Sequence, residues 1–342
     1  MNSTPPRRTH AGAASRPMEA SEAGDNRGLF QALVGNGDGL VALTGFVLAA
    51  SGAFAFFLAA TGHFLPHDIA FLGMTSEQLR SVADSKVVHF MIHDRVAFGG
   101  SIIAVGTQYL WLSLFPLRQG RSWAWWTLAV SSVVGFGSFL TYLGYGYLDT
   151  WHGIATLALL PIFILGLIRS RQALCPRGGI SELLIAGHRP KLWNRYGAGR
   201  ALILATAVSL LLGGATVMGV GMTSVFVPQD LAFMGISTEE IAAISPKLVP
   251  LIAHDRAGFG GGVCCCGLTM LMMVYCGRPS KALWQTLAIV GIAGFGSAVG
   301  VHFLIGYTDL LHLAPAYFGV LMYSAGLVLT YPRMMRGDAA DN

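Results

Sequence analysis

Two copies of one tripeptide, His-Asp-Arg, are the residues of this sequence best suited to chemistry. An aspartate and a histidine follow each copy further along the chain. Imidazole nitrogens bind haem iron or transition metals, and a nearby carboxylate can accept the other ring N–H and so orient the ring. The residues are His93, Asp94, Arg95, Asp149 and His152 in the first copy, and His254, Asp255, Arg256, Asp309 and His312 in the second.

Three interpretations of these groups remain open. In the first, the four histidines are ligands of haem or of a transition metal. In the second, the groups form ion pairs that tie helix ends together, with Arg95 bridging Asp94 or Asp149. In the third, they recognise a substrate or an ion. The candidates for a catalytic role are Asp94, Arg95, Asp149, Asp255, Arg256 and Asp309.

Further histidines are unevenly distributed between the copies. His89 and His93 have the i, i+4 spacing that places two imidazoles on one helix face, so they are a candidate metal pair. Alternatively, His63, His67 and His89 are exposed loop histidines that bind no ligand. His302 lies within an apolar run, where it is either a functional group or a hydrogen-bonding link between helices.

An internal repeat must position these groups. Residues 64–73 match residues 226–235, the two His-Asp-Arg sequences match each other, and a Gly-Phe-Gly-Ser sequence at 135–138 recurs at 294–297. The offset is about 160 residues throughout. The chain therefore consists of two similar halves with the same order of motifs.

The composition places both halves in a membrane. Of all residues 54% are hydrophobic and 11% are charged, whereas about a quarter are charged in soluble domains, so a soluble enzyme is excluded. Dispersed basic residues without interleaved aromatic side chains exclude nucleic-acid binding. Eight runs are long and apolar enough to cross a bilayer as helices. They are residues 40–62, 96–116, 123–145, 153–170, 201–222, 257–277, 283–305 and 312–332.

The predicted fold is an all-α integral membrane protein with eight transmembrane helices in two four-helix bundles. Four spans per half is an even number, so the halves form a parallel repeat. The outer ends of the second and fourth helices of each bundle would converge and bring its two histidines together. Capping-box sequences at 75–78 and 237–240 predict a short helix in each outer loop.

The charge distribution predicts the orientation. Lys and Arg collect in cytoplasmic segments, and 17 of the 22 basic residues lie on the side that holds both termini. Both termini are therefore expected in the cytoplasm, and the protein in the cell inner membrane. The expected divisions are a disordered tail (1–38), a membrane unit (39–170), a cytoplasmic linker (171–200), a second membrane unit (201–333) and a tail (334–342).

This layout resembles the heme A synthase family over about residues 40–332. The resemblance rests on two tandem four-helix units, each with a long outer loop after its first helix and a histidine near the outer ends of its second and fourth helices. It implies haem ligation by His93 with His152 and by His254 with His312. The family's glutamate before the second-helix histidine and its outer-loop cysteine pair are absent from this sequence.

The function predicted from the sequence is that of a membrane redox protein or oxidoreductase with haem or a transition metal at the outer rim. A lipid-like or quinone-like substrate would reach it from the bilayer. The alternatives are a transporter or channel with an acidic outer mouth, and a structural or assembly subunit. No charged residue lies near the middle of a predicted span, which disfavours ion-coupled transport.

Overall fold

The structure is a computed structural model that describes residues 36–140, 147, 150–174 and 177–336, without the side chains of residues 139, 140, 151 and 152. Every regular element in these ranges is helical, so the all-α prediction is confirmed. Among the described residues, seven helices are long and apolar enough to cross a bilayer, as expected of a multi-pass membrane protein. The end of the third predicted span, residues 141–145, lies outside the described residues.

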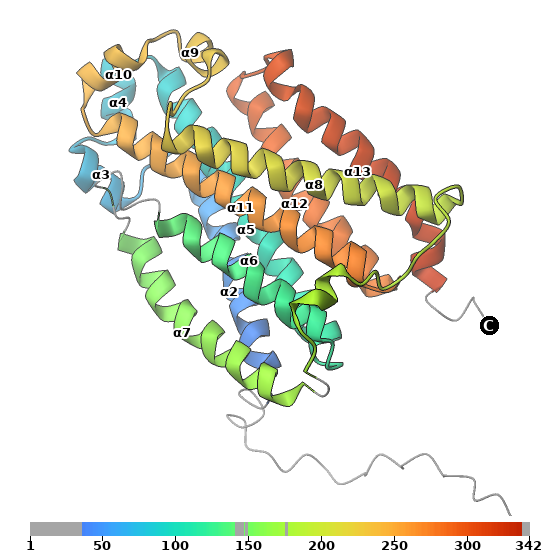
Figure 1. Cartoon of the computed structure of the whole chain (residues 1–342). Helices are drawn as coiled ribbons and strands as arrows, with labels where there is room; N and C mark the ends of the chain where they lie inside the picture. The colour runs from blue at the N-terminus through green and yellow to red at the C-terminus, as the bar shows by residue number, and fades with distance from the viewer. Residues whose placement is uncertain (1–35, 141–146, 148–149, 175–176, 337–342) are drawn as a thin grey trace, which may run out of the picture.

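Long helices run side by side and form the body of the molecule (Figure 1). Their apolar sequences favour helices because a backbone in hydrocarbon must satisfy its own hydrogen bonds. They are α2 (Asp38–Ala60), α5 (Ser85–Leu112), α6 (Ser122–Leu140), α7 (Thr150–Ala173), α8 (Arg195–Met222), α11 (Leu248–Cys276), α12 (Lys281–Ile305) and α13 (Leu310–Arg336). A π-helical turn, η1 (Ser113–Leu117), extends α5, and a 3-10 turn, η3 (Ile180–Leu184), lies in the linker.

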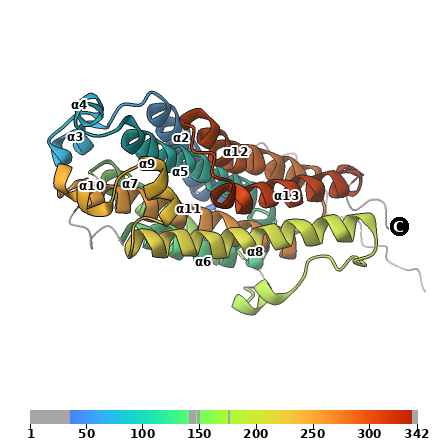
Figure 2. The same ribbon diagram turned by 90° about the horizontal axis from the view of Figure 1, so that it is seen from above.

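Four short helices gather at one end of this body, and the linker and the end of α13 lie at the other (Figures 1 and 2). They are α3 (Pro66–Leu72), α4 (Ser76–Val82), α9 (Pro228–Met234) and α10 (Thr238–Ile244). The predicted capping boxes are confirmed at α4 and α10, where Thr75 Oγ1 and Ser237 Oγ each accept a backbone N–H at 3.2 Å. The sequence predicted one short helix per loop, and the proline-initiated α3 and α9 are additional.

The two halves are interleaved. α5 and α11, which carry the His-Asp-Arg sequences, pack against each other, α12 packs along α5, and α6 packs along α11. Each of α5 and α11 packs against the first long helix of its own half, α2 or α8, and against the third long helix of the other half. This arrangement differs from two self-contained four-helix bundles, in which each helix would contact only helices of its own half.

Glycines allow these helices to approach closely. Gly100 lies at the α5–α12 crossing, where a Cβ atom would stand 1.8 Å from Ser297 Oγ and 2.5 Å from the Ala293 carbonyl oxygen. Gly52 and Gly99 face each other in the same way across the α2–α5 crossing. Membrane helices use small residues for close packing because hydrophobicity supplies no drive between them in lipid. Gly99 and Gly100 therefore allow the close packing of α5 against α2 and α12.

We expect Gly100→Ala to lower the free energy of unfolding by about 1–3 kcal/mol, since the added methyl group must push α5 away from α12. Gly296→Ala on α12 is the matched control, because a Cβ atom at that position meets nothing within 4 Å. Reversible unfolding of both variants in detergent micelles measures the difference. Equal stability of the Gly100→Ala variant and the unchanged protein would contradict the close approach.

Candidate functional site

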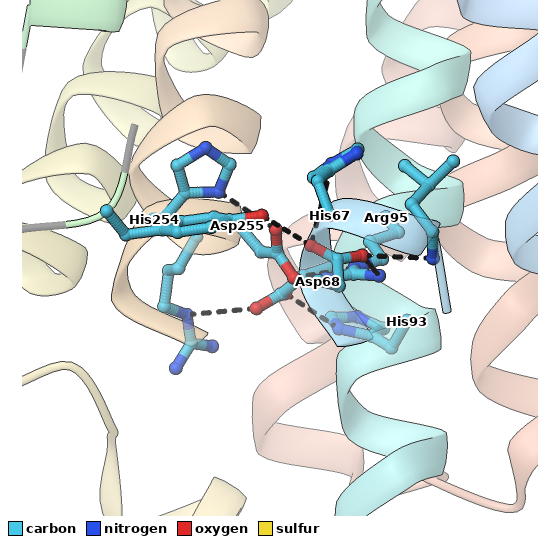
Figure 3. A network of polar contacts seen from close by, with 10 residues as sticks. His67, Asp68, His93, Arg95, His254 and Asp255 are labelled. Atoms are coloured by element: carbon cyan, nitrogen blue, oxygen red, sulfur yellow. Dashed lines mark hydrogen bonds and ion pairs between the residues drawn. The ribbon is translucent and has the colours of Figure 1, made fainter. Parts of the chain in front are cut away.

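The two His-Asp-Arg sequences exchange charged partners where α5 meets α11. Arg95 of α5 donates from Nη1 to Asp68 Oδ2 at 2.6 Å and from Nε to Asp255 Oδ2 at 2.7 Å. Figure 3 shows the carboxylates of Asp68 and Asp255 between side chains of the two helices. Asp68 belongs to the outer loop of the same half, and Asp255 belongs to the other half. The guanidinium of Arg95 thus ties α3, α5 and α11 together.

Arg256 of α11 has the equivalent surroundings. It donates from Nη1 to Asp230 of α9 and to the Val225 carbonyl oxygen, and its Nε lies 3.9 Å from Asp94 Oδ2. Val225 has a left-handed backbone with φ at 65°, which is costly for a β-branched residue and is held here by that hydrogen bond. Each arginine therefore binds the outer-loop aspartate of its own half and faces the His-Asp-Arg aspartate of the other.

This pairing corrects one predicted ion pair. Arg95 was expected to bridge Asp94 or Asp149, but its partners are Asp68 and Asp255, because α11 lies where a within-half partner was expected. Asp149 lies outside the described residues. Asp309 caps α13 instead, with its Oδ1 accepting the His312 backbone N–H at 2.7 Å.

Two tyrosines complete the network. Tyr147 donates its hydroxyl to Asp68 Oδ1 at 2.5 Å, and Tyr307 donates to Asp230 Oδ1 at 2.9 Å. Burial raises the pKa of Tyr307, and the nearby carboxylate of Asp230 raises it further. The phenol therefore stays protonated and can donate its hydrogen bond. The sequence analysis did not identify Asp68, Asp230, Tyr147 or Tyr307 as site residues. Asp68 and Asp230 lie in the matching segments 64–73 and 226–235, and Tyr147 and Tyr307 stand two residues before Asp149 and Asp309, so the repeat was the available signal.

Electrostatics keep Asp68 ionised. Burial by itself raises the pKa of Asp68, but the charge of Arg95 and hydrogen bonds from Tyr147 and Arg95 outweigh burial and hold this pKa below its usual value. The side chain of Asp68 is 3% exposed and that of Arg95 is 15% exposed. Ions buried to this degree are tolerated only when each one is paired and hydrogen-bonded.

Three histidines converge beside this network, one each from α5, α12 and α13. The candidate ligand atoms of His93, His302 and His312 all lie within 4.8 Å of one another. The ring centroid of His302 lies 4.2 Å from that of His93 and 5.2 Å from that of His312. No other group of three or more His, Cys, Asp or Glu side chains among the described residues has ligand atoms this close together.

The local structure orients each of these rings. His93 Nδ1 lies 2.9 Å from Asp94 Oδ1, which leaves Nε2 for another partner. His302 Nδ1 donates to the Ala298 carbonyl oxygen one helical turn back, and its Nε2 is buried with no hydrogen-bond partner among the described residues. His312 lies in the first turn of α13, where the ring of Tyr307 stacks on it at 4.4 Å between centroids.

The grouping of the histidines differs from the prediction. His93 was expected beside His152 and His254 beside His312, but His93 and His312 come from different halves and lie together with His302. The reason is the packing of α12 along α5. The side chain of His152 lies outside the described residues.

The remaining predicted ligands lie elsewhere. His254 is oriented by Asp255, with 3.0 Å between Nδ1 and Oδ1, and its ring packs on Tyr147 of the first half at 4.9 Å. His89, proposed from its spacing with His93, is not a member of the three-histidine cluster. The sequence allowed either a functional or a structural role for His302, and the structure places this residue in the three-histidine cluster.

The cluster can hold a metal ion. Three imidazoles are a donor set that zinc, copper, iron or nickel accepts, and a carboxylate bound to the second nitrogen of a ligand histidine is a common support. A haem between His93 and His312 fits less well, since the macrocycle needs space beside both rings and the His302 ring lies next to each of them.

Comparison of the chain with protein-family models, curated proteins and solved structures found no match. The functional conclusion therefore depends on the geometry of the site.

The crossed ion pair predicts energetic coupling between the halves. Arg95→Gln leaves two buried carboxylates without their cation, so we expect a loss of about 3–5 kcal/mol in the free energy of unfolding. Asp255→Asn should cost less in the Arg95→Gln background than alone, with a coupling of about 0.5–3 kcal/mol in a double-mutant cycle. The more exposed pair of Arg80 and Glu77, whose charged atoms are 3.9 Å apart, is the control and should show little or no coupling. Additive effects of Arg95→Gln and Asp255→Asn would contradict the pairing.

The lowered pKa of Asp68 predicts a stability that depends on pH. Because the folded-state pKa lies below the unfolded value of about 3.9, the ionised group stabilises the fold above about pH 4. This contribution is lost as the pH falls through the folded-state pKa. We expect the difference in unfolding free energy between the unchanged protein and Asp68→Asn to be largest near pH 7 and to shrink in acid. A difference independent of pH would contradict the assignment.

Proposed function

We propose that this chain is a multi-pass membrane metalloprotein of the oxidoreductase class, with one transition-metal ion bound by His93, His302 and His312. The observation that carries the proposal is the convergence of three imidazole donor atoms from three helices within 4.8 Å. The buried His302 Nε2, without a described partner, supports it. A buried polar atom left without a hydrogen bond costs free energy, and a bound metal ion would satisfy it.

The ligand set supports an ion with an open coordination position. Three protein ligands leave at least one position of a tetrahedral or larger coordination sphere for water or substrate. Asp94 would hold the His93 ring with Nε2 toward the ion. When bound, such an ion supplies Lewis acidity or electron transfer, and the residues of the chain orient it and exclude water.

The surroundings favour redox chemistry over hydrolysis. A hydrolytic metal site usually includes a carboxylate that is free to act as a base on the bound water. Around this cluster Asp94 contacts His93 through Oδ1 and faces Arg256 Nε at 3.9 Å through Oδ2, Asp230 binds Arg256 and Tyr307, and Asp309 accepts a backbone N–H. The ring of Tyr307 stacks on the imidazole of His312, while its hydroxyl donates to Asp230.

We infer an extracytoplasmic position for the site in the cell inner membrane. Eight spans as a parallel repeat, with cytoplasmic termini, put the linker and its basic residues inside. The four short helices lie at the opposite end of the helical body from the linker. The three-histidine cluster adjoins one of these helices, because Asp230 of α9 binds Tyr307, whose ring stacks on His312. The bound ion would therefore face the outer side, close to the polar boundary of the bilayer.

The transporter interpretation receives less support. An acidic outer mouth would need open carboxylates, whereas the side chains of Asp94 and Asp255 are 1% and 8% exposed and both lie in ion pairs. A structural or assembly subunit would use the same ion pairs and have no need of the three-histidine cluster.

Metal analysis tests the proposal. Detergent-purified protein should contain close to one transition-metal ion per chain, and His302→Ala should remove most of it, because one of three ligands is lost. His89→Ala is the matched control, since this histidine of α5 stands outside the cluster, and its metal content should stay unchanged. Asp94→Asn, which keeps the shape of the side chain, should weaken metal binding about 10–100-fold.

Two outcomes would reject this assignment. Protein that binds no transition metal even after incubation with zinc, copper or iron salts would favour the structural subunit. A Soret absorption band from bound haem that survives His302→Ala would favour haem ligation by other histidines. Helical circular dichroism of each variant shows that metal loss does not result from unfolding.

A further inference from the structure

A second site lies on the other side of α5, between α2, α5 and α7. The structure has a cavity of about 480 Å³ there, within the range of pockets that bind small molecules. Its wall on α2 includes the small residues Ala50, Ser51 and Ala55, which leave room where larger side chains would fill the space. The cavity is therefore a consequence of side-chain size along one face of α2.

The cavity is long and opens toward the bilayer. Its lining extends on α2 from Val47 to Ala59, about 18 Å of helix at about 1.5 Å per residue, and so over half of a hydrocarbon core about 30 Å thick. Phe54 lines it and is 62% exposed, and Ala155 of α7 lines it and is exposed as well. A molecule dissolved in the bilayer can enter from this side without crossing the protein.

The outer end of the cavity is polar. Asp68, Arg95 and Asp255 of the ion-pair network line it together with His63. The two carboxylates share one guanidinium, so these three groups together carry one net negative charge when ionised. This charge repels phosphate and carboxylate head groups, whereas carboxylate oxygens accept hydrogen bonds from hydroxyl groups.

We propose that this cavity binds an amphiphile with a neutral, hydroxyl-bearing head group and an apolar tail, of the long-chain hydroquinone (quinol) type. The hydroxyl groups would lie at the outer end against the carboxylates, and the tail would follow α2 toward the middle of the bilayer. The choice of a quinol rests on the proposed function, because a membrane redox centre needs an electron carrier that is soluble in lipid. The binding site itself follows from the cavity and its charge.

The second half supplies a matched control position. Gly52 and Gly214 occupy equivalent places, each against a glycine of the next long helix, so Ala55 on α2 corresponds to Val217 on α8. Ala55→Trp would fill the cavity, and Val217→Trp would place the same side chain on the equivalent helix away from it. Ala155→Phe fills the cavity from α7 and serves as a second, independent variant.

Binding of decylubiquinol to the detergent-purified full-length chain, measured by equilibrium dialysis under reducing conditions, tests the proposal. We expect decylubiquinol to bind at least ten-fold more tightly than decylbenzene, which has a ring and a tail but no hydroxyl group. Ala55→Trp and Ala155→Phe should each weaken this binding at least ten-fold, and Val217→Trp should change it less than two-fold.

Three results would overturn the inference. They are equal binding of decylbenzene, equal loss of binding in Val217→Trp, and unchanged binding in both cavity-filling variants. Metal content measured on the same preparations separates this inference from the proposed function. If the protein contains metal but does not bind decylubiquinol, the quinol site alone is rejected. If the protein contains no metal but binds decylubiquinol in the cavity, the metal proposal alone is rejected.

Discussion

The exchange of charged partners between α5 and α11 is the constraint on which the rest of this structure depends. Arg95 reaches an aspartate of the second half, and Arg256 faces an aspartate of the first. Buried charges are tolerated only when they are paired, so the ends of α5 and α11 that carry the His-Asp-Arg sequences must stay together. The outer loops are tied to the same point through Asp68 and Asp230, which also fix α3 and α9 over the helix ends.

The same crossing brings the imidazoles together. His93 is carried by α5 to a position against α12 and α13, where His302 and His312 lie. The aspartate beside His93 thus has two tasks, since Asp94 orients the imidazole through Oδ1 and faces Arg256 with Oδ2. Duplication of the half did not produce two identical sites, because the repeat partner of His302 in the sequence is Tyr142, a residue outside the described ones. The three-histidine cluster therefore takes one histidine from the first half and two from the second.

Arg95 and Asp255 connect this framework to the bilayer. They pair with each other in the network and also line the outer end of the cavity between α2, α5 and α7. A ligand in that cavity would meet the same charges that hold α5 against α11. The three-histidine cluster and the cavity would then adjoin one ion-pair network, the first through Asp94 and the second through Arg95 and Asp255.

The sequence by itself determined the all-α class of the fold, the long apolar helices of a membrane protein, the repeated motifs, the capped short helices between the first and second long helices of each half, and the set of polar residues at the ends of the long helices. Each of these follows from local composition or from one half compared with the other. The pairing of helices between halves could not be predicted this way, because both halves carry the same motifs and each motif fits a partner from either half equally well. Contacts far apart in the sequence decided it, chiefly Gly100 against Ser297 and Arg95 against Asp255. For the same reason, only the tertiary structure separated His93 from the predicted grouping within its own half and placed it with His302 and His312.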